Sequence, residues 1–465
     1  MTLTRYDVVA VPVPPAVTPL RTDVAGFAGR LTRGPAGLPV RIGDRAELSR
    51  VFGPLTGGVH LPRAVEGYFV NGGEVAYVVR LLGPGATLAT RRLDLGGGPQ
   101  VHLCATSPGA WASRLAVRVT RRAIAPMWAV EAQPVGEPAE ISYGATLAAA
   151  AAGLSLVAFD IPETLPAVAV GTISAELGES TDGDPPGTAE YRAALRDLTS
   201  EPEVALLALP DLWADVPEDG YALAGEAARA AYATVDRMLV LDLPPGADPL
   251  AAADRLATNL PTPAARAVAV YHPWIAVLPA DADRVVLPPS GHVTGLISRL
   301  DRERGPARTP ANATLTDAVD LDGPVDEAAL AARRVNPIRS APRRGLQVWG
   351  GRTFDPAASG RFVAHRRLTH RLVRAARQAA EPLVFEPVAA PLLRALTRAI
   401  TTVLLAAFNA RTLAGRTPAE AFRVDATAGE GLVVCDVSFA PANPMEFITV
   451  RLTLGPEGQL EVIEQ

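Results

Sequence analysis

The side chains that most often carry catalysis or bind metals are few in this sequence. None of its six histidines belongs to an H-E-x-x-H motif. His365 and His370 are five residues apart, so one helical face does not easily present both. The other histidines stand alone in the sequence: His60, His102, His272 and His292. We therefore expect no metal site.

Two cysteines and one acidic turn complete the candidates for metal or thiol chemistry. Cys104 and Cys435 are too few for a disulfide framework or a multi-cysteine zinc site. Cys104 lies in an apolar run, which is typical of a small buried hydrophobe. The Asp-Gly-Asp of residues 182–184 resembles part of a calcium loop, but that loop needs further oxygen ligands and a closing Glu, and two prolines follow here. A turn is the better interpretation.

Motifs for nucleotide binding or nucleophilic catalysis are absent. The sequence has no P-loop, no G-x-G-x-x-G after a strand and no G-x-S-x-G elbow. Ser290 is too close to His292 to act with it as nucleophile and base without a third partner, and a tight turn explains both residues. We expect no cofactor and no enzyme activity. An α/β enzyme of unknown substrate stays open only as an alternative that rests on fold class.

The composition is that of an ordinary globular protein. The chain has 465 residues, 48% hydrophobic and 20% charged, which is enough for two to four domains with cores of their own. It has no run of 18 or more apolar residues, and its start lacks the layout of a signal peptide. We therefore expect assembly in the cytoplasm and no direct membrane insertion.

A basic block between residues 331 and 380 is the strongest charge feature. It carries twelve arginines against one acid, Asp355, a net charge of +11 that leaves −16 for the rest of a chain whose total is −5. Such a block suits an acidic partner as well as a solvated face. Its only aromatic residues are Trp349, Phe354 and Phe362, and no nucleic-acid module accompanies them. We expect no nucleic-acid partner.

Alternating strands and helices predict an α/β fold, in part α+β, made of several domains. A Pro-rich extended arm is expected at the start, because proline fixes φ and removes a hydrogen-bond donor. The buried strands 204–209, 238–243 and 267–271 alternate with helices, which predicts a mostly parallel sheet covered on both faces. The expected parts are an arm over 1–22, an α/β domain over 23–98 and 180–325, an inserted β-rich domain over 99–179, a C-terminal α/β domain over 326–445 and an arm strand over 446–465.

Shorter patterns predict individual elements. Asp44 and Glu47 have the spacing of a capping box before a helix over Arg45–Phe52. The Ala-rich run Tyr143–Leu156 fits a helix or a strand. Thr87–Pro99 is Gly-rich and indicates a linker.

The C-terminal part predicts two helices and a strand. In the helix over 365–378, Leu368 and Leu372 share one face and arginines occupy the others. The helix over 390–410 is more apolar, so we expect it to be more buried. The segment Phe447–Leu454 alternates with a period of two, as a strand does.

The segment Val335–Arg367 carries the most distinctive pattern. It opens with a turn, passes through a basic loop to a short apolar strand, and ends in a Gly-Gly-Arg-Thr sequence before the Arg-rich helix. It resembles the signature of contractile tail sheath proteins in eight residues: Asn336, Pro337, Arg339, Gly345, Trp349, Gly350, Arg352 and Thr353. Further matches follow in order along some 430 residues, among them the 22–27 segment, Pro210-Asp211, Pro273-Trp274 and the 288–292 turn.

The resemblance implies a structural subunit that assembles as stacked six-membered rings around an inner tube and contracts to drive the tube through a target envelope. Its implied partners are copies of itself, the inner tube protein, and baseplate and cap proteins of a phage tail or phage-tail-like particle. Strands exchanged between subunits link the rings in this family. The corresponding arm residues here are Val8, Val9, Val11, Phe447, Ile448, Val450, Leu452 and Leu454.

We further expect the Arg-rich helix to present a basic surface to an acidic tube, through Arg366, Arg367, Arg371, Arg374 and Arg377. The N-terminal arm departs from the family's Pro-Gly-Val-Tyr pattern, and Val388 and Leu393 stand where Asn and Trp are common. These departures leave open a sheath paralogue that acts as an end cap or adaptor of the same machine.

Overall fold

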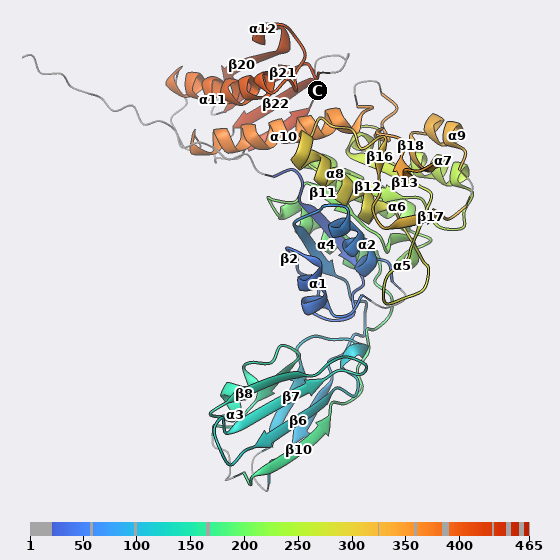
Figure 1. Ribbon diagram of the computed structural model, residues 1–465. Helices are drawn as coiled ribbons and strands as arrows, with labels where there is room; N and C mark the ends of the chain where they lie inside the picture. The colour runs from blue at the N-terminus through green and yellow to red at the C-terminus, as the bar shows by residue number, and fades with distance from the viewer. Residues whose placement is uncertain are drawn as a thin grey trace, which may run out of the picture. The chain divides into compact units, whose positions relative to one another are not determined.

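The computed structural model describes residues 21–464 except 56–58, 97–99, 164–167, 324, 358–359, 384–389, 430–431, 443–447 and 455–459. The chain divides into two compact units. We call Thr22–Arg366 the α/β unit, and Arg367–Gln465 together with the N-terminal residues up to Arg21 the C-terminal unit. The mixed α/β fold class is confirmed (Figure 1).

A nine-stranded sheet is the framework of the α/β unit, in the order β16-β19-β18-β13-β12-β11-β1-β3-β2. The central strands β18, β13, β12, β11, β1 and β3 are parallel, and the apolar runs of β11, β12 and β13 predicted this for those three strands. The edge strand β2 pairs antiparallel with β3, and at the other end β19 pairs antiparallel with both β18 and the edge strand β16. The bounds are β1 Ala25–Gly29, β2 Val40–Ile42, β3 Ala76–Arg80, β11 Leu206–Ala208, β12 Met238–Asp242, β13 Val268–His272, β16 Ala313–Thr314, β18 Val335–Ala341 and β19 Gly345–Val348.

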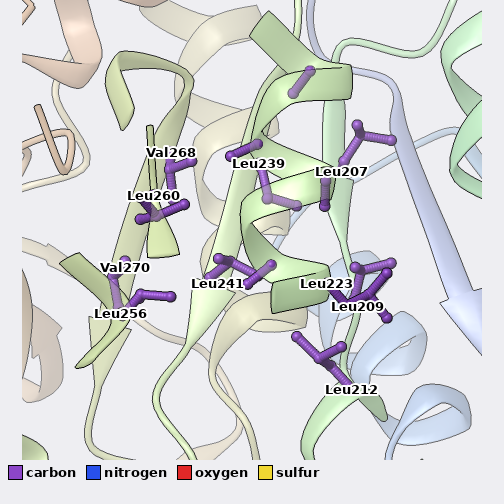
Figure 2. Packing of buried hydrophobic residues seen from close by; sticks show 14 of the residues in the cluster. Leu207, Leu209, Leu212, Leu223, Leu239, Leu241, Leu256, Leu260, Val268 and Val270 are labelled. Carbon is purple, nitrogen blue, oxygen red and sulfur yellow. The ribbon is translucent and has the colours of Figure 1, made fainter. Parts of the chain in front are cut away.

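Two hydrophobic cores cover the two faces of this sheet, because successive strand side chains point to opposite sides. Leu239 and Leu241 of β12 enter one core, and Val240 enters the other. Figure 2 shows the first core, where leucines from strands and helices converge. Burying one such leucine stabilises the fold by about 1.5–3 kcal/mol. The helices of the first core are α4 Thr188–Ser200, α5 Leu212–Asp215, α6 Gly220–Ala233, α7 Pro249–Asn259, α9 Glu327–Ala332 and the 3₁₀ turn η2 Ala264–Ala267.

The second core is closed by α1 Arg45–Phe52, α2 Leu61–Val70 and α8 Ser290–Arg304. The start of α1 confirms the predicted cap: Asp44 Oδ1 accepts the Glu47 N–H at 2.7 Å, and Glu47 Oε2 accepts the Gly43 N–H at 2.8 Å. Helices α2 and α8 pack closely at Gly295 of α8. A Cβ at this position would collide with the carbonyl oxygen of Tyr68 on α2.

Two antiparallel sheets with a core of their own form between β3 and α4 of the α/β unit. One has the order β4-β5-β9 and the other β10-β6-β7-β8 (Figure 1). The bounds are β4 Thr90–Leu93, β5 Val101–Ala105, η1 Ala110–Ala112, β6 Ala116–Arg121, β7 Trp128–Gln133, β8 Glu140–Gly144, α3 Leu147–Ala151, β9 Val157–Asp160 and β10 Gly171–Glu176.

The predicted inserted domain, 99–179, corresponds to these sheets but begins too late. Residues 87–99 were expected to be a linker, yet they contain β4, the edge strand of the first sheet. Thr90 of β4 pairs with Cys104 of β5. The Ala-rich run after Tyr143 resolves into the end of β8 and helix α3, whose N-cap is Thr146.

The predicted start of the C-terminal domain at 326 is wrong. Residues 335–348 form β18 and β19, which continue the nine-stranded sheet next to β13, and the compact units divide between Arg366 and Arg367. The sequence could not show this because β18 pairs with a strand some 65 residues earlier. A smaller sheet, β15-β14-β17, also belongs to this unit, with β14 Ile275–Val277, β15 Val285–Leu287 and β17 Ala318–Leu321.

The C-terminal unit contains two long helices and a four-stranded antiparallel sheet in the order β20-β21-β22-β23. Its elements are α10 Val363–Ala380, which runs through the boundary residue Arg367, η3 Glu381–Leu383, α11 Ala390–Asn409, α12 Pro418–Ala421, β20 Phe422–Ala428, β21 Val433–Phe439, β22 Ile448–Leu454 and β23 Leu460–Glu464. The expectation that α11 is the more buried helix is wrong, because most α10 side chains are buried whereas α11 buries only Leu392, Leu396, Ile400 and Leu404.

One helix in the described part of the chain, α11, is long and apolar enough to cross a membrane by length and composition. Its four buried leucine and isoleucine positions recur every four residues, which is the spacing of a stripe that faces a core.

Candidate functional site

Asn336 on β18 is the centre of the predicted signature. Its side-chain Nδ2 donates to the carbonyl oxygens of Val270, 3.0 Å away, and Arg352, 2.8 Å away. Its Oδ1 accepts the backbone N–H of Arg352 at 2.8 Å. A buried amide with all these partners ties the neighbouring strand β13 to the turn that follows β19. Gly350 makes room for it, because a Cβ there would lie 2.5 Å from Asn336 Oδ1.

The hairpin of β18 and β19 positions the next signature residues. Gly345 begins β19 with φ of +78°, a conformation that favours glycine. The Trp349 N–H donates to the carbonyl oxygen of Pro337 at 2.8 Å. The guanidinium of Arg339 stacks on the Trp349 ring and lies 3.3 Å from Glu327 of α9. Trp349 is nevertheless 40% exposed, so its outer edge is available to solvent or a partner.

Arg352 and Thr353 fasten the end of the segment. Arg352 Nη1 donates to the Ala331 carbonyl oxygen at 3.1 Å, and buried Thr353 Oγ1 donates to that of Gly360 at 2.6 Å. Asp355, the one acid of the basic block, is fully buried and lies 3.3 Å from Arg266. The signature residues are therefore used for internal contacts that hold strands, turn and helix together.

The carboxyl ends of the parallel strands are where α/β enzymes bind ligands, most often at the point where strand order reverses. Here that point lies between β1 and β11, since β1 has β3 on its other side. The carboxylate of Asp211, which follows β11, occupies the position at this point where a ligand would bind. Asp211 Oδ1 accepts the N–H groups of His60 and Leu61 at the start of α2, at 2.7 and 3.1 Å, and Oδ2 accepts that of Arg30 at 2.8 Å.

A second buried carboxylate repeats this arrangement one strand further on. Asp242 ends β12, and its Oδ1 accepts the Ser290 N–H at the start of α8 at 2.8 Å. A helix N-terminus attracts anions, and in both places the protein supplies the anion itself. Burial raises the pKa of Asp242 to about 7. Burial also raises the pKa of Asp211, against the opposing effect of its backbone hydrogen bonds.

Other titratable groups near this edge are also committed to internal contacts. Asp215 forms an ion pair with Arg30 at 2.7 Å and accepts a hydrogen bond from the Tyr191 hydroxyl at 2.9 Å. Burial and the neighbouring Asp211 raise the pKa of Asp215 to about 6. Burial lowers the pKa of His272, at the end of β13, to about 4. Asp215 is thus held by contacts within the protein, and His272 is partly buried at the same edge.

Asp211 was included in the sequence analysis only as part of a family pattern, and Asp242 was given no role. The signal that could have found their role is an Asp that directly follows an apolar strand and precedes a helix, since such a carboxylate can reach a helix N-terminus. The histidines hold no metal together: in the part of the chain that the structure describes, no group of three His, Cys, Asp or Glu side chains could bind an ion.

The predicted basic surface on α10 is only partly exposed. Arg366, Arg367 and Arg374 are buried, whereas Arg371 is exposed and Arg377 is partly exposed. Arg374 contacts the N-terminal end of the described chain: the carbonyl oxygen of Arg21 accepts a hydrogen bond from Arg374 Nη1 at 2.8 Å. The five arginines therefore do not form one exposed face of this chain.

The predicted arm strand lies within the four-stranded sheet of the C-terminal unit. Ile448, Val450, Leu452 and Leu454 are part of β22, which pairs with β21 on one side and β23 on the other. Arg451 of β22 forms an ion pair with Asp436 of β21 at 2.7 Å. Val8, Val9, Val11 and Phe447 lie outside the described residues. Within one chain the strand is thus paired on both edges, and its exchange between subunits stays a prediction.

Three solved structures are similar to this chain over its whole length. A sheath tail protein from Desulfitobacterium hafniense matches 98% of this chain and 100% of its own, with 13% sequence identity and a TM-score of 0.68. A chain of the helical sheath of the anti-feeding prophage in its contracted state matches 95% of this chain and 98% of its own, with 21% identity and a TM-score of 0.57. A chain in the baseplate structure of the anti-feeding prophage matches 96% and 98%, with 20% identity and a TM-score of 0.57.

A scan against protein-family models and a search of curated proteins found no match. The resemblance drawn from the motifs is confirmed at the level of the fold, because this chain shares the fold of sheath tail proteins from end to end.

Proposed function

We propose that this protein is a structural subunit of a contractile sheath, which assembles as stacked six-membered rings around an inner tube and contracts to drive the tube through a target envelope. The observation that carries the proposal is the extent of the similarity. It covers 95% or more of this chain and 98% or more of the two sheath chains, so every part of a sheath subunit has a counterpart here.

The internal commitment of the polar groups supports a structural role. Asp211 and Asp242 occupy the helix N-termini where an enzyme of this topology would hold a ligand. Each of the eight signature residues lies in a sheet, turn or loop where the polar ones fasten the backbone. On this proposal the chain carries no cofactor and catalyses no reaction, and the particle supplies the work of contraction from a metastable packing.

Strand exchange would link the rings through the C-terminal unit. The sheet β20-β21-β22-β23 has a chain-terminal hairpin, β22 and β23, that a subunit could donate to a neighbour while the neighbour's own hairpin leaves. The N-terminal arm, with Val8, Val9 and Val11, would add to an edge of the same sheet. Each backbone hydrogen bond contributes about 1 kcal/mol net, so a strand of several residues could hold rings together while their other parts rotate.

Contact with an acidic inner tube would use the exposed part of α10. Arg371 and Arg377 are its exposed or partly exposed arginines among the five predicted, and exposed ion pairs are worth about 0–1 kcal/mol each. Weak contacts of this kind suit a surface that must release the tube when the sheath contracts. The further partners on this proposal are the baseplate and cap proteins of a phage tail or phage-tail-like particle assembled in the cytoplasm.

A sheath paralogue that ends or adapts the sheath is the second candidate. The similarity to a chain in a baseplate structure favours it, together with the divergent N-terminal arm. Negative-stain microscopy of the overexpressed protein separates the candidates. Hollow striated tubes support the main sheath subunit, discrete rings support the end paralogue, and small uniform particles contradict both.

A further inference from the structure

A basic cavity lies at the C-terminal end of α8, away from the signature residues. It has a volume of about 280 Å³ and is lined by the last turns of α8 and by the chain that leads to β16. Arg299, Arg304 and Arg308 line it, and Glu303 is its one acidic residue. Arg344, from the hairpin of β18 and β19, reaches the cavity wall through a 3.4 Å hydrogen bond to Asn312 Oδ1. Four guanidinium groups thus face or border one concave surface.

The ion pairs around this cavity leave its charge unbalanced. The neighbouring Arg302 pairs with Asp23 at 3.5 Å and with Glu74 at 3.0 Å. For Arg304 and Arg308, both exposed, the described residues provide no ion pair within 4 Å. The helix dipole accounts for a cation in the last turn of α8, but Arg308 lies beyond the helix. A concave surface with one sign of charge concentrates its potential and attracts an anionic group, and arginine forks match a carboxylate.

An acidic ridge on the same unit offers such carboxylates. It is formed by the sheet β15-β14-β17 and its turns, where Asp283, Asp317, Asp320 and Asp322 are exposed. Asp320 forms an ion pair with Arg284 at 3.3 Å, so Asp283, Asp317 and Asp322 are the carboxylates that remain for a partner. Two apolar side chains are exposed beside them, Leu278 at 58% and Val319 at 51%. Burial of these two side chains against a partner would add an apolar contribution to a contact that the carboxylates direct.

We infer that the arginine cavity receives carboxylates from the acidic ridge of a second copy of this chain. Complementary charges on two different surfaces of one chain make a head-to-tail contact, which repeats from copy to copy and so builds rings or helical arrays. The opposite charges of the two surfaces favour a second copy of this chain as the occupant over a free anion. The inference rests on the proposed function for the kind of assembly that the contact serves.

The test reverses charge on each side and then on both. Arg304→Glu with Arg308→Glu should lower the amount of sedimentable assembly at least tenfold, and Asp283→Arg with Asp322→Arg should do the same. All four substitutions in one chain should restore assembly, because each surface then carries the opposite charge and the two surfaces still attract each other. Arg196→Glu with Arg229→Glu, on exposed positions of α4 and α6, changes the net charge equally and should leave assembly unchanged. Normal assembly of the Arg304 and Arg308 variant, or no restoration in the fourfold variant, would overturn the inference.

A cross-linking experiment keeps the inference separate from the sheath proposal. Chains with Arg308→Cys and chains with Asp322→Cys, both carrying Cys104→Ser and Cys435→Ala, are mixed and treated with a short bismaleimide. Cross-linked heterodimers should form even if the wild-type protein builds no tubes, and Arg229→Cys in place of Arg308→Cys should abolish them. Absence of the cross-link contradicts the contact. Titration with inorganic phosphate tests for a free-anion site. Saturable phosphate binding that needs Arg304 and Arg308, together with normal assembly of their variant, would identify such a site and overturn the inference.

Discussion

Single side chains in this protein form hydrogen bonds to backbone groups that backbone pairing usually satisfies. Asn336 satisfies two carbonyl oxygens and one N–H, which belong to Val270 of β13 and to Arg352 after β19. A family signature built on such a residue marks a fold constraint. Asp211 and Asp242 act in the same way on the first turns of α2 and α8.

Removing the Asn336 amide should destabilise the α/β unit. Asn336→Ala leaves two buried carbonyl groups and one N–H without their partner, which costs about 3 kcal/mol in the free energy of unfolding. Thermal unfolding followed by circular dichroism measures the change. Asn409→Ala, at an exposed position, is the control and should leave the melting temperature within error of the wild type. Equal melting temperatures for the two variants would show that the Asn336 bonds are not needed.

The pH dependence of stability should change when Asp242 is neutralised. The folded-state pKa of Asp242 is about 7, above its ordinary value of 3.8, so its contribution to stability is fully present below pH 3.8 and is lost as pH rises through 7. His272 and His292 have folded-state pKa values of about 4, so their contribution is present above pH 6.5 and is lost as pH falls toward 4. The opposing directions make the wild-type profile alone uninformative.

Comparison of the wild type with Asp242→Asn isolates the carboxyl group. Between pH 4.5 and pH 8 the wild type should lose stability relative to the variant, by a few kcal/mol at most, at about 1.4 kcal/mol per pKa unit. Urea unfolding across this range gives the difference directly. A difference that stays constant with pH would mean that Asp242 titrates at its ordinary value.

At the scale of elements, close helix packing sets the second core. Gly295 of α8 meets the backbone of α2 at Tyr68, and His292 lies against Gly67 of α2. The two helices approach closely over the sheet, and these contacts leave no space for a further methyl group.

Gly295→Ala should therefore destabilise the protein although alanine is the better helix former. We expect a loss of about 1–3 kcal/mol from overpacking, against a gain of about 1 kcal/mol in helix propensity. Glu303→Ala, on the exposed side of the same helix, serves as the control. Chemical denaturation of both variants decides the matter, and a stabilised Gly295→Ala protein would show that α2 and α8 can move apart at little cost.

Elements with strong local signals were predictable from the sequence. The capping box of α1 and the buried strands β12 and β13 follow from a few adjacent residues, because the relevant contacts are local or the whole strand is apolar. The place of β18 and β19 in the large sheet and the burial of Arg366, Arg367 and Arg374 were not predictable. They depend on segments distant in sequence, such as β13 and, for Arg374, the backbone at Arg21.

At the scale of the whole molecule, the terminal hairpin should be needed for assembly and not for folding. Deletion of residues 446–465 removes β22 and β23, whereas the α/β unit keeps its nine-stranded sheet and both cores. The truncated protein should keep its helical circular dichroism signal and a cooperative unfolding transition. In the sheath proposal it forms no tubes, since its subunits can no longer donate a strand. Tubes that persist after the deletion would contradict linkage through this hairpin.

Electron cryo-microscopy of the assembled wild-type protein tests the central claim most directly. The sheath proposal predicts hollow tubes of stacked rings with six subunits each, in which the sheet of the C-terminal unit contains strands from more than one subunit. Monodisperse monomers under all conditions, or a closed oligomer without stacking, would contradict a sheath subunit.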